Sequence, residues 1–155
     1  VSGLLLLIFT LDILSSPWVL TVASLIPLGI SMGLTEEYFP KWKKYFKWFA
    51  LIGFLAIAVT SLGGFDDVKR IAVPLFHGVA GLVIFLGPFF AKKAPKGFFW
   101  VGIGGLLIGL GGIALAFISV GKQLLFFSPE LVGTILTPLL FLMTGAFALG
   151  FAKRG

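Results

Sequence analysis

The chain contains no cysteine and no asparagine, and it has a single histidine, His77, and a single glutamine, Gln123. Without cysteine it can form no disulfide, no thiolate metal site and no thiol nucleophile, which excludes several classes of enzyme. The scarcity of amide side chains, which are labile to heat, predicts a thermophilic source. The alternative explanation is that a lipid bilayer disfavours these polar groups.

Charged residues are also scarce. They make up 12% of the 155 residues, whereas 59% are hydrophobic and the mean hydropathy is +1.12. Uncharged apolar runs of about 20 residues recur, which is the length a helix needs to cross a hydrocarbon core roughly 30 Å thick. Because lipid cannot satisfy backbone polar groups, each crossing should be helical. The sequence therefore predicts an all-α fold, a polytopic transmembrane helical bundle that forms one integral membrane domain over residues 1–155.

The apolar runs predict five clear spans, at about residues 18–34, 48–63, 71–91, 98–120 and 131–152. Residues 1–14, VSGLLLLIFTLDIL, precede the helix breaker Ser15-Ser16-Pro17. As a helix they would extend about 21 Å, which is short for a full crossing unless the site is tilted or thinned. The number of spans is thus five or six, and six is the preferred prediction.

Basic residues alternate between the two sides of the predicted spans. Nine of the twelve lie in the loop after the first clear span, in AKKAPK (residues 91–96) and in the C-terminal tail, and three lie in the intervening loops. Since positive residues favour the cytoplasmic side, the lysine-rich loops and the C-terminus are predicted to face the cytoplasm of a cell-membrane protein. This sorting explains the net charge of +6 better than nucleic-acid binding does.

The segment PKWKKYFKWF, residues 40–49, combines aromatic and basic side chains. Its rings recur at helical spacing and its lysines lie elsewhere around the helix, with Pro40 suited to a first helical position. This pattern predicts an amphipathic segment at the membrane interface, in contact with membrane lipids. The predicted interface residues are Trp42, Lys43, Lys44, Tyr45, Phe46, Lys47 and Trp48.

Small residues form a stripe along the fourth clear span. The stripe consists of Gly102, Gly105, Gly109, Gly112, Ala116 and Ser119, at spacings of three and four. Such a stripe allows another helix backbone to approach closely. The partner is either a neighbouring helix of the same chain, which is the preferred prediction, or the same helix of a second copy in a homo-oligomer.

His77 should face protein rather than lipid, because an imidazole and the backbone carbonyl freed by Pro74 are poorly placed against acyl chains. It is either a proton relay, a contact for a polar substrate or a haem ligand, or else a structural imidazole bonded to its own helix. Haem b is usually held by two histidines. The chain has one, so a second copy, Met32 or Met143 would have to supply the other ligand. We therefore predict no cofactor.

Four carboxylates fall near the predicted outer ends of their spans: Asp12, Asp66, Asp67 and Glu130. Together with His77 they form a candidate polar site, a vestibule for a cation, a lipid headgroup or a metal ion. The alternative is that Asp66 and Asp67 pair with Lys69 and Arg70, and that Glu130 stabilises a helix N-terminus through the dipole.

Three stretches carry a resemblance: SSPWVLTVASLIPLGISMGL, LGGFDDVKRIAVPLFHGVAGLVIF and SPELVGTILTPLLF. In layout the chain resembles a prokaryotic multi-pass membrane family catalogued as domain of unknown function nine-nine-eight, over residues 16–150. The resemblance implies a multi-pass fold and marks Asp66, His77 and Glu130 as positions of interest, but it implies no reaction.

Taken together, these features predict a non-enzymatic multi-pass membrane protein. It is either a small transport or permeation component or a subunit of a larger membrane complex. The alternatives are an intramembrane lipid-active or metal-dependent enzyme that uses Asp12, Asp66, His77 and Glu130, and a cytochrome subunit that binds haem b through His77.

Overall fold

The computed structural model describes the backbone of residues 16–119 and 128–152, and their side chains except those of residues 114–119, 129 and 130. This part of the chain is all-helical, which confirms the predicted helical bundle. Its five helices are α2 (Pro17–Tyr38), α3 (Lys43–Leu62), α4 (Asp66–Phe90), α5 (Phe99–Ser119) and α6 (Pro129–Ala152). α2, α3, α4 and α6 are long and apolar enough to cross a membrane, and α5 is apolar over Phe99–Ile113. The protein is therefore a multi-pass membrane protein. The predicted sixth span, residues 1–14, lies outside the described residues.

Local sequence signals explain where the helices begin and end. α2 starts with Pro17, whose missing N–H is no loss in a first turn. α3 ends before Gly64, which has a positive φ of 70° that other residues avoid. α4 starts at Asp66 rather than at residue 71, because Asp66 and Asp67 occupy the first turn, where carboxylates complement the helix dipole.

Hydroxyl side chains on α2 are buried without needing a partner on another helix. Thr21, Ser24, Ser31 and Thr35 donate hydrogen bonds to carbonyl oxygens three or four residues earlier in α2. The Ser31 Oγ reaches the carbonyl oxygen of Pro27 at 2.6 Å. Because their polar atoms are satisfied within the helix, these small side chains allow α3 and α4 to pack closely against α2.

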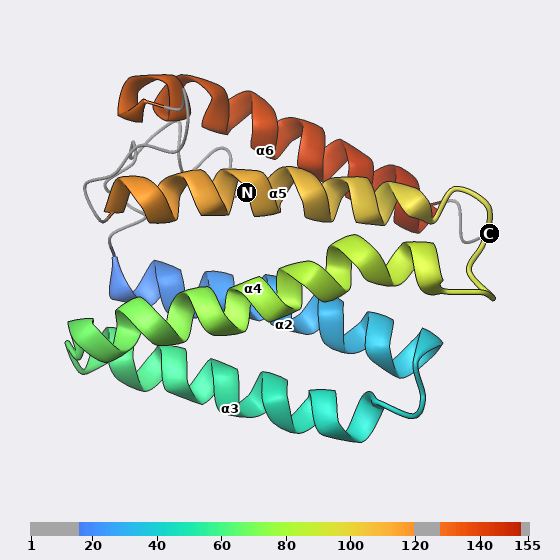
Figure 1. The fold of residues 1–155 in the computed structure, drawn as a ribbon, viewed down its shortest axis with the longest axis horizontal. Coiled ribbons are helices and arrows are strands. Elements are labelled where there is room, and N and C mark those ends of the chain that lie inside the picture. Colours follow the sequence, from blue (N-terminus) through green and yellow to red (C-terminus); the bar gives the residue numbers. More distant parts are fainter. Residues whose placement is uncertain (1–15, 120–127, 153–155) are drawn as a thin grey trace.

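The helices lie side by side and alternate in direction (Figure 1). α2, α3 and α4 meet around the buried residues Leu28, Ala50 and Ala80. A second buried cluster, made by Leu34, Ile84, Phe98 and Val101, joins α2 and α4 to the start of α5. α6 packs along α5, so α5 and α6 form a hairpin that is attached to the other three helices mainly through α4.

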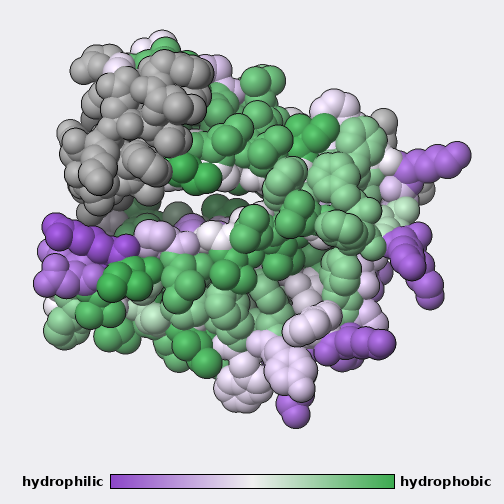
Figure 2. Space-filling model, viewed as in Figure 1, coloured by the Kyte–Doolittle hydropathy of each residue, from purple (hydrophilic) through white to green (hydrophobic). Residues whose placement is uncertain are grey.

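Hydrophobic side chains cover the length of the visible face, and hydrophilic ones gather at its two ends (Figure 2). The α2–α3 and α4–α5 connections lie at the same end of the bundle (Figure 1). These connections and the start of α3 carry seven exposed lysines, so we call this the lysine-rich end. The lysines are Lys41, Lys43, Lys44, Lys47, Lys92, Lys93 and Lys96.

The predicted interfacial segment is not a separate helix. Residues 40–42 form a turn, and α3 begins at Lys43 rather than at Pro40. Trp42, Tyr45 and Trp48 are exposed. Phe46 instead packs against the Leu28 cluster, because α3 turns this side toward the other helices. The aromatic residues of the segment thus divide between the surface and the core.

Candidate functional site

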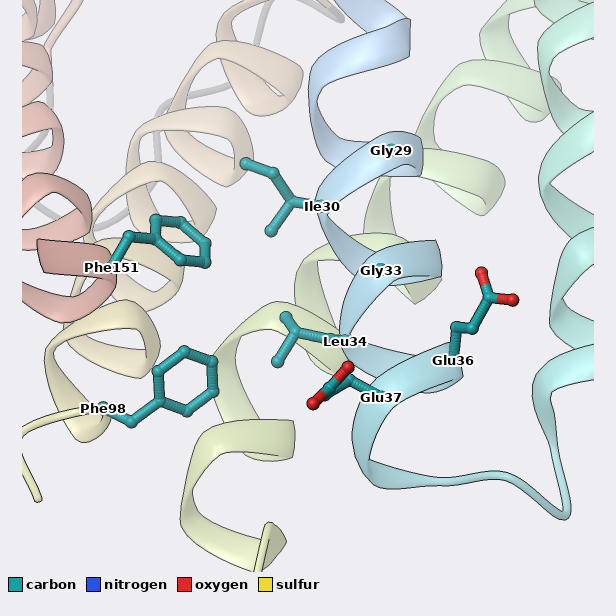
Figure 3. A pocket seen from close by; sticks show the side chains of 8 residues that line it. All are labelled: Gly29, Ile30, Gly33, Leu34, Glu36, Glu37, Phe98 and Phe151. Atoms are coloured by element: carbon teal, nitrogen blue, oxygen red, sulfur yellow. The ribbon is translucent and has the colours of Figure 1, made fainter. Parts of the chain in front are cut away.

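A groove opens between α2 and the ends of α5 and α6 that meet it (Figure 3). Its volume is about 390 Å³. α2 contributes most of the lining, while Phe98 comes from the residue before α5 and Phe151 from the last turn of α6. The lining residues are Gly29, Ile30, Gly33, Leu34, Glu36, Glu37, Phe98 and Phe151.

The groove has room beside α2 because two of its lining residues, Gly29 and Gly33, have no side chain. Gly29 and Gly33 are four residues apart and therefore share one face of α2. A Cβ atom at either position would meet nothing within 4 Å among the described residues. Because neither residue has a side chain, this part of α2 is covered less than the faces that contact α3 and α4.

Aromatic rings form the opposite wall of the groove. The ring of Phe98 lies 5.1 Å from that of Tyr38 and 6.0 Å from that of Phe151, measured between centroids. Phe98 and Leu34 are almost fully buried, with 1% and 3% of their surface exposed. The groove therefore has a packed apolar base formed by α2, α6 and the α4–α5 connection.

Two carboxylates lie at the edge of this apolar groove. Glu36 and Glu37 are exposed and belong to the last turn of α2. Figure 3 shows the Glu37 side chain beside Leu34, while the Glu36 side chain extends from the other side of α2. In the described part of the chain the two ion pairs are Lys69 with Asp66 and Arg70 with Asp67, so neither glutamate is neutralised by a salt bridge there.

A second pocket adjoins the first through Glu37. Its volume is about 350 Å³, and it is lined by Glu37, Tyr38, Lys93 and Pro95. This pocket contains one basic and one acidic group, whereas the groove contains two acidic groups and no basic one. Within these two pockets, the groove is thus the one suited to a group with an apolar body and a positive charge.

The outer carboxylates of the predicted polar site lie apart from this groove. Asp66 accepts a hydrogen bond from the Lys69 ammonium, and Asp67 lies 3.7 Å from Arg70. Both carboxylates are exposed in the first turn of α4. This arrangement is the ion-paired turn described above as the alternative to a vestibule.

Two further members of the predicted site have no described side chain. Asp12 lies outside the described residues. Glu130 is in the first turn of α6, where the Leu131 amide donates to Ser128 Oγ at 3.2 Å. Ser128 therefore caps α6, as expected for a serine at this position.

His77 is the twelfth of the 25 residues of α4, so it lies near the middle of the span rather than in its outer part. α4 begins five residues before the expected residue 71, so His77 lies farther from the helix start than the predicted span implies. A rise of about 1.5 Å per residue puts His77 about 15 Å along the axis from Asp67. The structure thus does not bring the histidine together with Asp66 and Asp67. The described residues contain no group of three histidines or carboxylates that could hold a metal ion.

The imidazole of His77 is half-buried, and among the described residues its Nδ1 atom has no hydrogen-bond partner of normal geometry, although the backbone of Val73 lies beside the ring. Ser61 Oγ, near the end of α3, is likewise buried with no hydrogen-bond partner in the part of the chain that the structure describes. Neither atom lines the groove.

The glycine stripe on α5 divides into two parts. A Cβ atom at Gly102 would lie 2.7 Å from the carbonyl oxygen of Phe85, and one at Gly105 would lie 2.8 Å from the amide nitrogen of the same residue. These two glycines therefore pack directly on the α4 backbone. Gly109 and Gly112 have nothing within 4 Å among the described residues. The side chains of Ala116 and Ser119 are not described.

The groove and its lining residues were not predicted from the sequence. The sequence signal for them is Gly29-Ile-Ser-Met-Gly33, in which two small residues are separated by three others, followed by the adjacent acidic residues Glu36 and Glu37. Phe98 and Phe151 carry no comparable signal, because nothing local shows that residues so far apart in the chain approach each other.

No family model matches this chain, and neither a curated protein nor a solved structure is significantly similar to it. The resemblance to a multi-pass family of unknown function thus stays a prediction from the residues quoted above.

Proposed function

We propose that the protein is a small membrane transport component that binds an amphipathic cation in the groove beside α2. The cation would have an apolar body, held by the aromatic wall, and a positive charge that faces Glu36 and Glu37. The groove lies near the lysine-rich end of the bundle. If that end faces the cytoplasm, as the positive-inside pattern predicts, the groove opens toward the cytoplasmic side.

One observation carries this proposal: two glutamates without a salt bridge in the described part of the chain border an apolar groove. The whole chain has only six acidic residues. An unpaired carboxylate next to apolar surface repels anions and lowers the free energy of a cation that rests there. The exposed ring of Phe151 adds attraction for a positive charge.

The two contributions to binding differ in size. Apolar contact provides about 25 cal/mol for each Å² removed from water, so the body of the ligand should dominate affinity. Each exposed carboxylate adds less, because solvent screens it. Charge therefore selects cations over anions, while the apolar groove determines how tightly they bind.

Uptake of tetraphenylphosphonium into vesicles that contain the purified protein tests the proposal. Replacement of both glutamates by Glu36→Gln and Glu37→Gln should slow the initial uptake by roughly three- to tenfold, as expected for the loss of two exposed charge interactions. The matched control is Asp67→Asn, which removes a fully exposed carboxylate at the other end of the bundle and should leave the rate unchanged. Wild-type uptake no faster than that of empty vesicles would refute the transport role.

A further inference from the structure

The start of α3 carries three lysines whose charges are not balanced within the described part of the chain. Lys43, Lys44 and Lys47 are all exposed. Both ion pairs found among the described residues lie at the start of α4, which is at the other end of the bundle. These three ammonium groups therefore have no salt bridge to a described carboxylate.

The other charged residues of the lysine-rich end do not compensate for them. Lys41 and the three lysines of the α4–α5 connection add further positive charge. The carboxylates described at this end are Glu36 and Glu37, which border the groove beside α2. Figure 2 shows hydrophilic side chains extending outward from this end of the bundle. The lysine-rich end thus has a net positive charge.

Three lysines are unfavourable at the start of a helix. Positive charges there oppose the helix dipole, and lysines four residues apart, as Lys43 and Lys47 are, repel each other. The first turn of α3 contains no acidic residue, and the side chain of Trp42, at the N-cap position, makes no capping hydrogen bond. The lysines therefore do not serve the stability of α3, and an anion beside them would offset their repulsion.

The three lysines and Trp48 form two neighbouring rows on the exposed side of α3. Lys43 and Lys47 make one row, and Lys44 and Trp48 make the other, because residues four apart lie above one another along a helix. All four side chains are exposed, whereas Phe46 packs into the core. A phosphate group between the rows can meet several ammonium groups, with the indole of Trp48 one turn further along α3.

Exposed aromatic rings place this surface at the depth of lipid headgroups. Trp42, Tyr45 and Trp48 expose 66%, 72% and 58% of their surface. Tryptophan and tyrosine side chains prefer the membrane interface, where the ring contacts lipid and the polar atom reaches water. The apolar run of α3 begins directly after them, at Phe49. The lysines thus lie at the level of the lipid phosphates.

We propose that the surface formed by Lys43, Lys44, Lys47 and Trp48 binds the headgroup of an anionic phospholipid. Lysines near a membrane surface attract acidic lipids, whereas a zwitterionic lipid has no net charge for them to attract. The cation groove is lined by α2, α6 and the α4–α5 connection, and no residue of α3 belongs to it. The lipid site is therefore independent of the proposed transport role.

Quenching of tryptophan fluorescence by brominated lipids tests the proposal in the intact protein. The chain has four tryptophans, so Trp18→Phe and Trp100→Phe leave Trp42 and Trp48 as the reporters. Dibrominated phosphatidylglycerol and dibrominated phosphatidylcholine are compared in bilayers of unbrominated phosphatidylcholine. The difference in quenching gives the relative affinity of this surface for the two lipids. We expect the anionic lipid to bind roughly three- to tenfold more tightly.

Neutralisation of the lysines should remove this preference. In the reporter protein, the triple change Lys43→Gln, Lys44→Gln and Lys47→Gln should bring the relative affinity of the two lipids close to one. The matched control, Lys69→Gln with Arg70→Gln, removes positive charge at the other end of the bundle and should leave the preference unchanged. Each variant is first checked as a monodisperse particle in detergent. Lys43→Gln with Lys47→Gln replaces the triple change if the latter does not fold.

Three results would overturn the proposal. The first is equal quenching by the two lipids, and the second is a preference that survives the neutralisation of the lysines. The third is a preference that inorganic phosphate abolishes but sodium chloride of the same ionic strength does not, because free phosphate would then be the ligand of this surface.

Discussion

Gly105 of α5 lies directly against the backbone of Phe85 in α4, so closely that a Cβ atom at position 105 would come within 2.8 Å of the Phe85 amide nitrogen. Two of the three nearest atoms belong to the backbone of a helix and cannot rotate away, as a side chain would. The junction between α4 and the α5–α6 hairpin therefore depends on this glycine.

Gly105→Ala should destabilise the protein by about 1–3 kcal/mol, because the added methyl group must push two helices apart. The measurement is thermal unfolding of the purified protein in detergent, followed by the loss of the monodisperse peak in size-exclusion chromatography. Gly145→Ala on α6 is the control, since a Cβ there meets nothing within 4 Å among the described residues. Equal unfolding temperatures for the two variants would contradict the close contact.

His77→Leu should stabilise the protein by about 1 kcal/mol, since it keeps a similar volume and removes a polar Nδ1 atom that has no hydrogen-bond partner among the described residues. His77→Gln, which retains a polar group at the same place, should bring no such gain. Both are measured by the same thermal unfolding assay. A marked loss of stability in His77→Leu would mean that the imidazole has a partner in the folded protein, and would reopen its predicted role as a ligand or proton relay.

Cysteine accessibility tests the predicted orientation. Lys43→Cys and Lys93→Cys lie at the lysine-rich end of the bundle, whereas Phe65→Cys lies in the exposed turn between α3 and α4. In intact cells a membrane-impermeant maleimide should label only Phe65→Cys, and permeabilised cells should show labelling of all three. Labelling of Lys43→Cys and Lys93→Cys from different sides would contradict both the fold and the orientation.

The fold was largely predictable from the sequence. A bilayer requires long uncharged runs and internally bonded backbones, and both requirements appear directly in the residues. Helix ends were less predictable because polar residues extend helices beyond the apolar run. Asp66 and Asp67 show this effect, since they begin α4 before the hydrophobic stretch does.

The candidate site was not predictable in the same way. Charge sorting predicts on which side of the membrane a carboxylate falls, but a shared side does not bring side chains into contact. Glu36 and Glu37 adjoin an apolar groove because Phe98 and Phe151, distant in the chain, pack beside α2. Such a contact depends on how helices pair, which a single sequence does not specify.

The stripe on α5 shows how far a pattern can predict contacts. Its spacing correctly indicated a face suited to close approach, and Gly102 and Gly105 meet α4. The same spacing continues through Gly109 and Gly112, where α4 diverges. The spacing of small residues therefore identified the face of α5 that packs against another helix. It did not indicate how much of that face α4 contacts.

The central claim, a cation site in the groove beside α2, is tested most directly by equilibrium binding of tetraphenylphosphonium to the protein in lipid nanodiscs. Phe151→Ala removes one of the two rings that line the groove and should weaken binding by roughly tenfold, the effect of about 1.4 kcal/mol of lost apolar contact. Phe141→Ala, at a site on α6 that is 79% exposed, should bind as the wild type does. Equal dissociation constants for the wild type, Phe151→Ala and the double variant Glu36→Gln, Glu37→Gln would contradict the account.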